Sequence, residues 1–291
     1  MVAVGSEVKT LHPGDEVYGM DAAHPVIPWS LVGYCSEYVV TKASYVLRKP
    51  SHLSMEEAVS LLASVITAYQ GFKLGMSVMP GSGSDKLEGK TVFVPAALGS
   101  TGFVACQMLK KVYGAGKVIA TVSTPKVPMV DELMPGVVDQ IVDYKTQDVV
   151  EEVGRGRVDF VYNTIGGLSA LYPIISPDTG VVVAIAGAVP KSDTLRSLFG
   201  DLLPIWVAWI CDLAQYWYTW KLRGTNIKQE CFSANPGVRQ DLEASGEIIA
   251  TGKLKAVMRV VDLSDLEAVR RECGHVETMT GGVGKLIIKI A

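Results

Sequence analysis

The chain has 291 residues, of which 48% are hydrophobic and 20% charged, and its formal net charge is −3. This length allows two modest domains, and the mildly acidic balance with scattered lysines and arginines argues against a nucleic-acid partner. The five cysteines and four histidines stand singly, without a C-x-x-C pair, so we expect reduced thiols and no metal site. Because the first residues also lack the basic and apolar segments of a signal peptide, we expect a cytoplasmic protein.

Residues 1–56 contain short candidate β-segments, such as 13–17 and 37–40, bounded by glycine and proline. We interpret them as part of a small β-rich domain. Tyr34 lies where that domain should face a ligand, so it is a candidate proton donor; the alternative is an ordinary core or rim tyrosine.

A helix is predicted to begin after Ser54, because Glu57 stands three residues further on and completes a capping box. Its apolar positions recur with helical spacing, and it leads through Thr67 toward a glycine- and serine-rich loop.

The segment VFVPAALGSTGFVACQ is the most informative pattern in the chain. An apolar run typical of a buried strand is followed by Gly99 and Gly102 and then by an amphipathic helix, whose N-terminal amides attract a pyrophosphate. The dinucleotide fingerprint G-x-G-x-x-G has Ala97 in its first place here, and Ser100 and Thr101 separate the two glycines. The turn therefore favours a dinucleotide, with a simple packing turn as the alternative.

Apolar strands and helical segments alternate downstream of this turn. The further predicted strands cover 118–122, 140–144, 158–162 and 181–185, with a helix at 129–133. This order is typical of a doubly wound parallel (Rossmann) sheet, and we assign residues 57–253 to a dinucleotide-binding domain.

The residues after the second strand of this domain indicate which cofactor it holds. An NAD site uses an acidic residue there, whereas this strand ends in Ser123, Thr124 and Lys126. Two hydroxyls and an ammonium suit the 2′-phosphate of NADPH. The alternative is a polar loop in which Ser123 or Thr124 caps a helix.

Residues 202–220 form the most apolar run and hold Trp206, Trp209, Trp217 and Trp220. Three interpretations stay open: a pocket wall for a small apolar or aromatic substrate, the subunit interface of a homodimer, or a helix in peripheral contact with a membrane. A membrane span is disfavoured by the polar residues within the run.

Residues 254–291 are predicted to contain two strands, 254–261 and 284–290, on either side of a helix at 264–272. We expect the last strand to return to the β-rich domain, which would make that domain discontinuous.

Several motifs together resemble the medium-chain dehydrogenase/reductase superfamily, in its zinc-free branch of quinone oxidoreductases and enoyl reductases. They lie at 14–17, 36–39, 66–69, 97–107, 123–126, 142–144 and 284–285. The resemblance implies a GroES-like β-rich domain beside the Rossmann sheet. It also implies that Ser123, Thr124, Lys126 and Tyr144 bind the adenosine 2′-phosphate, that Asn163 and Gly187 lie beside the ribose and nicotinamide, and that Thr67 lies near the nicotinamide.

Members of this family usually have further strands before the segment equivalent to residues 1–5, so the resemblance implies a β-rich domain that is truncated at its N-terminus. We expect an NADPH-dependent, metal-independent oxidoreductase that reduces an enone, enoyl or quinone substrate by hydride transfer. The alternative is a non-redox cyclase or isomerase, or a membrane-associated binding protein, on the same fold.

Overall fold

The computed structural model describes residues 1–20, 35–80, 86–199, 203–278 and 282–290, and the chain divides into two compact units. The first unit joins Met1–Thr67 to Asn235–Ala291, and the second is Ala68–Ala234. A long helix, α1 (Met55–Val78), contributes residues to both units. Its start confirms the predicted capping box: the Glu57 amide donates to Ser54 Oγ (3.1 Å), and the Ser54 amide donates to Glu57 Oε2 (2.8 Å).

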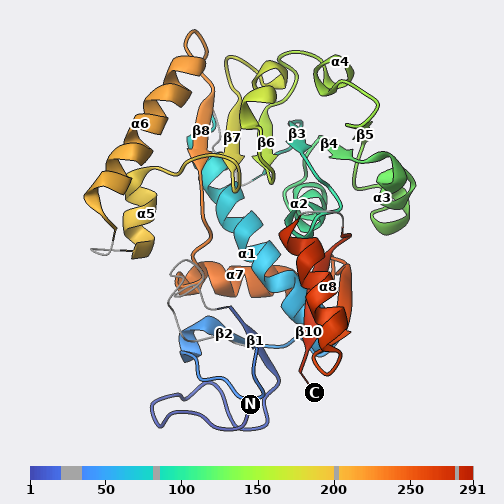
Figure 1. Cartoon of the computed structure of the whole chain (residues 1–291), viewed down its shortest axis with the longest axis vertical. Coiled ribbons are helices and arrows are strands. Elements are labelled where there is room, and N and C mark those ends of the chain that lie inside the picture. The colour runs from blue at the N-terminus through green and yellow to red at the C-terminus, as the bar shows by residue number, and fades with distance from the viewer. Residues whose placement is uncertain (21–34, 81–85, 200–202, 279–281, 291) are drawn as a thin grey trace. The chain divides into compact units, whose positions relative to one another are not determined.

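The second unit is built on a six-stranded parallel sheet (Figure 1). Its strands are β3 (Thr91–Val94), β4 (Lys117–Val122), β5 (Gln140–Asp143), β6 (Phe160–Asn163), β7 (Val181–Ala184) and β8 (Lys228–Cys231). They lie in the order β5-β4-β3-β6-β7-β8, and every neighbouring pair is parallel. From β3 the chain first adds β4 and β5 on one side of the sheet, and it then returns to add β6, β7 and β8 on the other side of β3. Ligands of such sheets bind at this switch point between β3 and β6, outside the carboxyl ends of the strands.

Helices connect these strands in chain order. They are α2 (Ser100–Lys111), η2 (Thr124–Lys126), α3 (Val127–Leu133), α4 (Val149–Val153), η3 (Leu168–Ala170), η4 (Tyr172–Ile174), α5 (Ser192–Phe199) and α6 (Ile205–Lys221). The predicted strand and helix alternation is therefore confirmed, with shifts of one or two residues at most boundaries.

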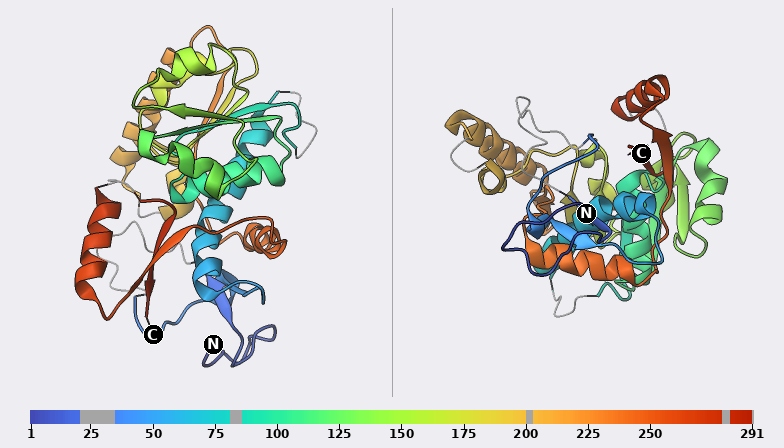
Figure 2. Two further views of the ribbon diagram at one scale, coloured as in Figure 1. Left: turned by 90° about the vertical axis from the view of Figure 1, so that its right-hand side faces the viewer. Right: turned by 90° about the horizontal axis from the view of Figure 1, so that it is seen from below.

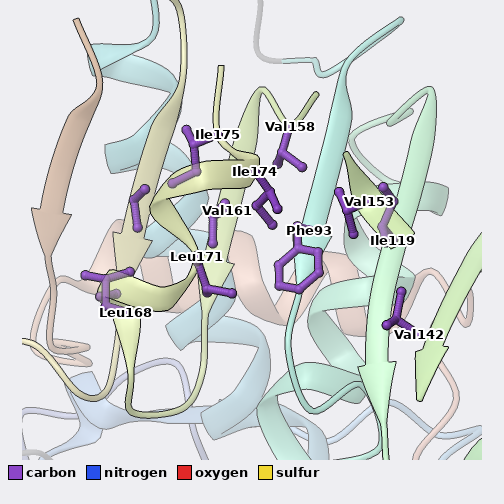
Figure 3. Close-up of a cluster of buried hydrophobic side chains, with 12 residues drawn as sticks. Phe93, Ile119, Val142, Val153, Val158, Val161, Leu168, Leu171, Ile174 and Ile175 are labelled. Carbon is purple, nitrogen blue, oxygen red and sulfur yellow. The ribbon is translucent and has the colours of Figure 1, made fainter. Parts of the chain in front are cut away.

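One face of the sheet is covered by the segment that contains η3 and η4. Figure 3 shows Phe93 and Val161 on the sheet directed toward Leu171 and Ile174, and all four side chains are buried. The opposite face carries Phe160, Tyr162 and Val183, which alternate with the residues of the first face along their strands.

The C-terminal half of α1 covers this second face. Phe72 is fully buried and makes edge-to-face contacts with Tyr162 (ring centroids 4.8 Å apart) and Phe160 (6.0 Å). Gly75 permits the close approach, since a Cβ there would lie 2.3 Å from the Phe160 ring. Apolar burial on both faces explains why β6 and β7 have continuous rather than alternating apolar sequences, and the doubly wound fold is confirmed.

The first unit contains two small sheets (Figure 2). In one, β1 (Val17–Gly19) and β2 (Val46–Arg48) are antiparallel; in the other, β9 (Met258–Asp262) and β10 (Lys285–Lys289) are parallel. The short helix η1 (Ala43–Tyr45) and the helices α7 (Arg239–Ala250) and α8 (Leu266–Glu277) complete it. The C-terminal strand is tied to the start of α1 by an ion pair between Lys289 and Glu56 (3.3 Å).

Helix α7 belongs to the first unit, so this unit begins again at residue 235 and not at the predicted 254. The Arg239 guanidinium explains the difference, because its Nη1 donates to the carbonyl oxygens of Ser44 (3.0 Å) and Val46 (2.8 Å). Gly246 also lies against the Leu47 side chain, where a Cβ would be 2.7 Å from it. The predicted domain of 57–253 is therefore longer at both ends than the second unit.

The predicted β-segment at 37–40 is wrong. These residues are not in a strand, and Tyr38 and Val40 are exposed. A strand is defined by its ladder, and residues 37–40 have no neighbouring strand within the described ranges.

Candidate nucleotide-binding site

The turn between β3 and α2 is held by close backbone contacts. The Gly99 amide donates to the Ala96 carbonyl (2.9 Å), and Ala96 has a positive φ of 53°. Gly102 is required, because a Cβ there would lie 2.3 Å from the Ala96 oxygen. Gly99 has an ordinary φ of −72°, so its role differs: it is the N-cap of α2 and has no side chain to accept the first amides of the helix.

Thr121 of β4 fixes this turn against the sheet. Its hydroxyl accepts a hydrogen bond from the Ala96 amide (3.2 Å), and its carbonyl accepts one from the Ala97 amide (3.0 Å). The predicted residues Ser100 and Thr101 form the first turn of the twelve-residue helix α2, whose last turn carries two lysines. An uncapped N-terminus with its positive dipole end forms a favourable site for a phosphate group.

The residues that end β4 and β5 are brought together at the same edge of the sheet. Val122 and Asp143 are register partners, and the Tyr144 amide donates to the Val122 carbonyl (3.2 Å). Ser123 and Tyr144, predicted as parts of one site, therefore follow adjacent strand ends. Thr124 and Lys126 form the ends of the short helix η2, which comes directly after Ser123.

Asp143 is an acidic residue in this cluster that the sequence analysis did not identify. A hydrogen bond from the Thr124 side chain lowers its pKa below the usual value, and the Lys145 amide also donates to its Oδ1 (3.0 Å). The hydroxyl proton of Thr124 is thus directed at Asp143. Because the pKa is lowered, the stabilisation from this carboxylate is present above the pKa of the unfolded chain and is lost as the pH falls below about 4.

Lys145 is a second residue of this cluster that the sequence pattern did not indicate. Its ammonium lies 5.4 Å from the centroid of the Tyr144 ring, which is half exposed. Lys145 follows β5 whereas Lys126 follows β4, so only the pairing of these strands associates the two cations with one edge.

The loops after β6 and β7 are joined by Asn163, which is fully buried. Its Nδ2 donates to the carbonyls of Ile165 (2.6 Å) and Ala186 (3.1 Å), while its Oδ1 has no hydrogen-bond partner among the described residues. Gly187 has a φ of 72°, and a Cβ there would lie 2.4 Å from the Gly166 Cα. A buried oxygen without a donor is costly, so it is suited to a ligand that supplies one.

The two predicted catalytic residues stay predictions. Tyr34 lies outside the described residues. Thr67 belongs to the first unit, and its hydroxyl donates to the Ala63 carbonyl of its own helix (2.6 Å). Within the described ranges, no three His, Cys, Asp or Glu side chains are grouped so that they could hold a metal.

Comparison with known proteins supports the assignment from the fold. The model of a zinc-binding dehydrogenase family matches residues 138–274. A 2-methylene-furan-3-one reductase of Solanum lycopersicum is 34% identical over 190 residues, which are 65% of this chain and 45% of that protein. An NADPH-dependent alkenal/one oxidoreductase of Arabidopsis thaliana, named as chloroplastic, is 31% identical over 65% of this chain and 45% of its own length. The chain thus spans less than half the length of these curated relatives.

A solved quinone oxidoreductase from Coxiella burnetii has the same fold, with a TM-score of 0.69 and 23% identity over all of this chain and 76% of that one. The strand order and the glycine turn define the class as doubly wound Rossmann proteins of the dinucleotide-binding type. The chain is similar to members of the medium-chain dehydrogenase/reductase superfamily, in the branch of quinone oxidoreductases and enoyl reductases.

Proposed function

We propose that the protein is an NADPH-dependent oxidoreductase that reduces a conjugated carbonyl compound, either an enone or enoyl substrate or a quinone. The observation that carries this proposal is the edge formed by the carboxyl ends of β3 to β7. Three features belong to that edge: the start of α2 without a side-chain cap, the cluster that follows β4 and β5, and the Asn163 oxygen, which has no partner in the described part of the chain. The relatives named as reductases of this substrate class support it.

The residues fit a dinucleotide in extended form across this edge. The amides at the start of α2, with Ser100 and Thr101, would hold the pyrophosphate, and Gly99 and Gly102 allow it to approach the backbone. Ser123, Lys126 and Tyr144 would hold the 2′-phosphate, with the backbone of Thr124 fixed by Asp143. Asn163 and Gly187 would position the ribose and nicotinamide, because the Asn163 amide sets the distance between the two loops.

When bound, NADPH supplies the hydride, and the protein supplies orientation and a site from which water is excluded. Metal independence remains part of the proposal, so polarisation of the substrate carbonyl would depend on hydroxyl groups and backbone amides. Thr67 and Tyr34 remain the proposed hydroxyls for this role.

We also propose a cytoplasmic location. All five cysteines are free thiols in the structure, and Cys35 and Cys273 among them are exposed. Cell fractionation with a tagged full-length chain tests this proposal, and recovery in an organelle fraction would contradict it.

Lys126→Ala is expected to weaken the binding of NADPH about tenfold to a hundredfold, while the binding of NADH changes little. The reason is that a hydrogen bond to a charged group contributes about 1.5–3 kcal/mol, and only NADPH has the 2′-phosphate. Fluorescence titration with both cofactors measures the ratio. Lys117→Ala is the matched control. Lys117 lies at the amino end of β4, so this substitution removes the same charge from the opposite edge of the sheet. Equal affinities of the wild-type protein for NADPH and NADH would contradict the assignment.

Incubation with C4-deuterated NADPH and a panel of enones and quinones tests the reaction itself. With label at both C4 positions, we expect loss of the nicotinamide absorbance with either substrate class and retained deuterium at the β-carbon of a reduced enone; a hydroquinone would lose the label to water. Product that forms without NADPH, or a reduced enone without deuterium, would replace the reductase with a non-redox enzyme on this fold.

A further inference from the structure

Helix α6 carries an apolar stripe on the surface of the second unit. Its members are Trp206, Trp209, Leu213, Tyr216, Trp217 and Trp220, and between 52% and 75% of each side chain is exposed. Because a helix turns by about 100° per residue, the six positions fall within an arc of about 100°. We call this face the α6 stripe, and Figures 1 and 2 show its helix at the outer margin of the unit, beside α5.

Hydrogen bonds on the opposite side of α6 fix the outward direction of the stripe. Gln215 Nε2 donates to the Val189 carbonyl (3.0 Å), and the Val189 amide donates to the Tyr218 hydroxyl (3.0 Å). Ala208 and Cys211 are buried on that side as well. A rotation of the helix that buried the stripe would break these contacts, so a partner meets the helix along its length and not at its end.

The stripe is at least as large as the largest apolar patch of an ordinary monomer. An aromatic side chain has roughly 150–250 Å² of surface, so the five aromatic members together expose on the order of 500 Å² or more, and Leu213 adds to this. The largest apolar patch of a typical monomer is about 300–600 Å², and patches of this size mark sites of contact with proteins or membranes.

The composition of the stripe suits the interface of a lipid bilayer. Four of its six members are tryptophan and a fifth is tyrosine. These two side chains are enriched at the level of the headgroups, because the ring is apolar while its N–H or O–H group stays hydrated. The rings stand on a single helix over about 21 Å, and a fluid lipid surface accommodates such a row without a groove of matching shape.

Two cations adjoin the C-terminal end of the stripe. The Lys221 ammonium lies 5.0 Å from the centroid of the Trp217 ring, and the Arg223 guanidinium lies 5.1 Å from that of Trp220. A helix that lies on a membrane usually carries such cations along its polar face. In α6 that face packs against the rest of the unit, so the cations are confined to the end of the helix.

The surroundings of these cations contain few acidic groups. Asp212 lies outside the arc of the stripe, and its Oδ1 accepts a hydrogen bond from the Ser192 amide at the start of α5 (3.4 Å). Residues 213–229 contain no acidic side chain, and Lys228 adds a third exposed cation. Anionic membrane surfaces attract cations within a Debye length, so this end of α6 is complementary to anionic headgroups.

We propose that the α6 stripe docks the protein on a phospholipid bilayer that contains anionic lipids. The helix lies along the surface, with its indole and phenol rings between the headgroups and the acyl chains, and Lys221 and Arg223 contact the headgroup phosphates. No charged side chain belongs to the stripe, so its insertion desolvates no ion. None of the helices in the described parts of the chain is long and apolar enough to cross a membrane.

Sedimentation of the full chain with vesicles tests this proposal. We expect binding to vesicles of phosphatidylcholine with phosphatidylserine, weaker binding to phosphatidylcholine alone, and a decrease of the difference at high salt. Tryptophan emission gives a second readout, because four of the five tryptophans belong to the stripe. Vesicles should shift the emission to the blue, and lipids brominated on their acyl chains should quench it.

Leu213→Glu places a charge at the centre of the stripe and is expected to lower the partition coefficient about tenfold or more. Leu266→Glu is the matched control and should bind as the wild type does, because Leu266 of α8 is also an exposed leucine, 55% exposed against 69% for Leu213. Lys221→Ala should lower binding to the phosphatidylserine vesicles about fivefold and leave binding to phosphatidylcholine unchanged. Since all three positions are exposed, the variants should keep the wild-type circular dichroism.

Wild-type protein that stays in the supernatant with both kinds of vesicle would overturn the proposal, as would vesicle binding that Leu213→Glu leaves intact. Protection of the tryptophans from acrylamide when the protein is concentrated without vesicles would assign the stripe to a contact between protein molecules instead.

Discussion

Gly102→Val is expected to abolish nucleotide binding, with a loss of at least a hundredfold in affinity. A Cβ at this position would lie 2.3 Å from the Ala96 carbonyl oxygen and 3.1 Å from its carbon, and both are backbone atoms that cannot rotate away. The start of α2 would have to move away from the turn, and the amides proposed to hold the pyrophosphate would move with it. A displacement of about 1 Å at a binding site can cost on the order of 10²-fold.

Titration with NADPH measures the effect, and Gly274→Ala provides the control. Gly274 lies inside α8, where a Cβ meets no atom within 4 Å, so alanine should be tolerated and should favour the helix. Circular dichroism of the Gly102→Val protein separates a lost site from a lost fold. Unchanged NADPH affinity in a folded Gly102→Val protein would show that the turn does not hold the cofactor.

Phe72→Ala is expected to lower the free energy of unfolding of the second unit by about 3–5 kcal/mol. The ring is fully buried and contacts Tyr113, Phe160 and Tyr162 edge to face, at centroid distances of 5.3, 6.0 and 4.8 Å. Its removal leaves a cavity between α1 and the sheet that the Phe160 and Tyr162 rings, held by β6, cannot close.

Urea unfolding followed by circular dichroism measures this loss. Val59→Ala on the exposed side of α1 is the control, and it should change the midpoint little because Val59 is 38% exposed. A Phe72→Ala protein as stable as the control would mean that α1 does not support the sheet in this way.

Local sequence patterns were sufficient to predict the central strands of the sheet and the turn after β3. Strands that are buried on both faces need continuous apolar runs, as in Val181–Ala184, and the dense glycine turn before α2 has few other uses. The capping box of Ser54 and Glu57 was predictable for the same reason, since both partners lie within one helical turn. The proposed cofactor residues Ser123 and Lys126 were identified from their place after an apolar run.

Contacts between residues far apart in the sequence decided the parts of the fold and of the site that local patterns did not predict. Strand β8 has the polar sequence KQEC and was not predicted, because an edge strand is defined by its pairing with β7 and not by its own pattern. The hydrogen bond from Thr124 to Asp143 joins the short helix after β4 to the end of β5, so the order of residues along the chain did not reveal an acidic group near the proposed phosphate site.

The sequence by itself determined the class of fold, because apolar periodicity and turn residues are local properties that the chain carries wherever it is placed. It could not decide among the interpretations of the tryptophan-rich run. Only the tertiary structure assigned Gln215 and Tyr218 to the buried side of α6 and left Leu213 and its aromatic neighbours exposed. The physical reason is that an apolar helix has no preferred inner face until the hydrogen bonds of its few polar side chains choose one.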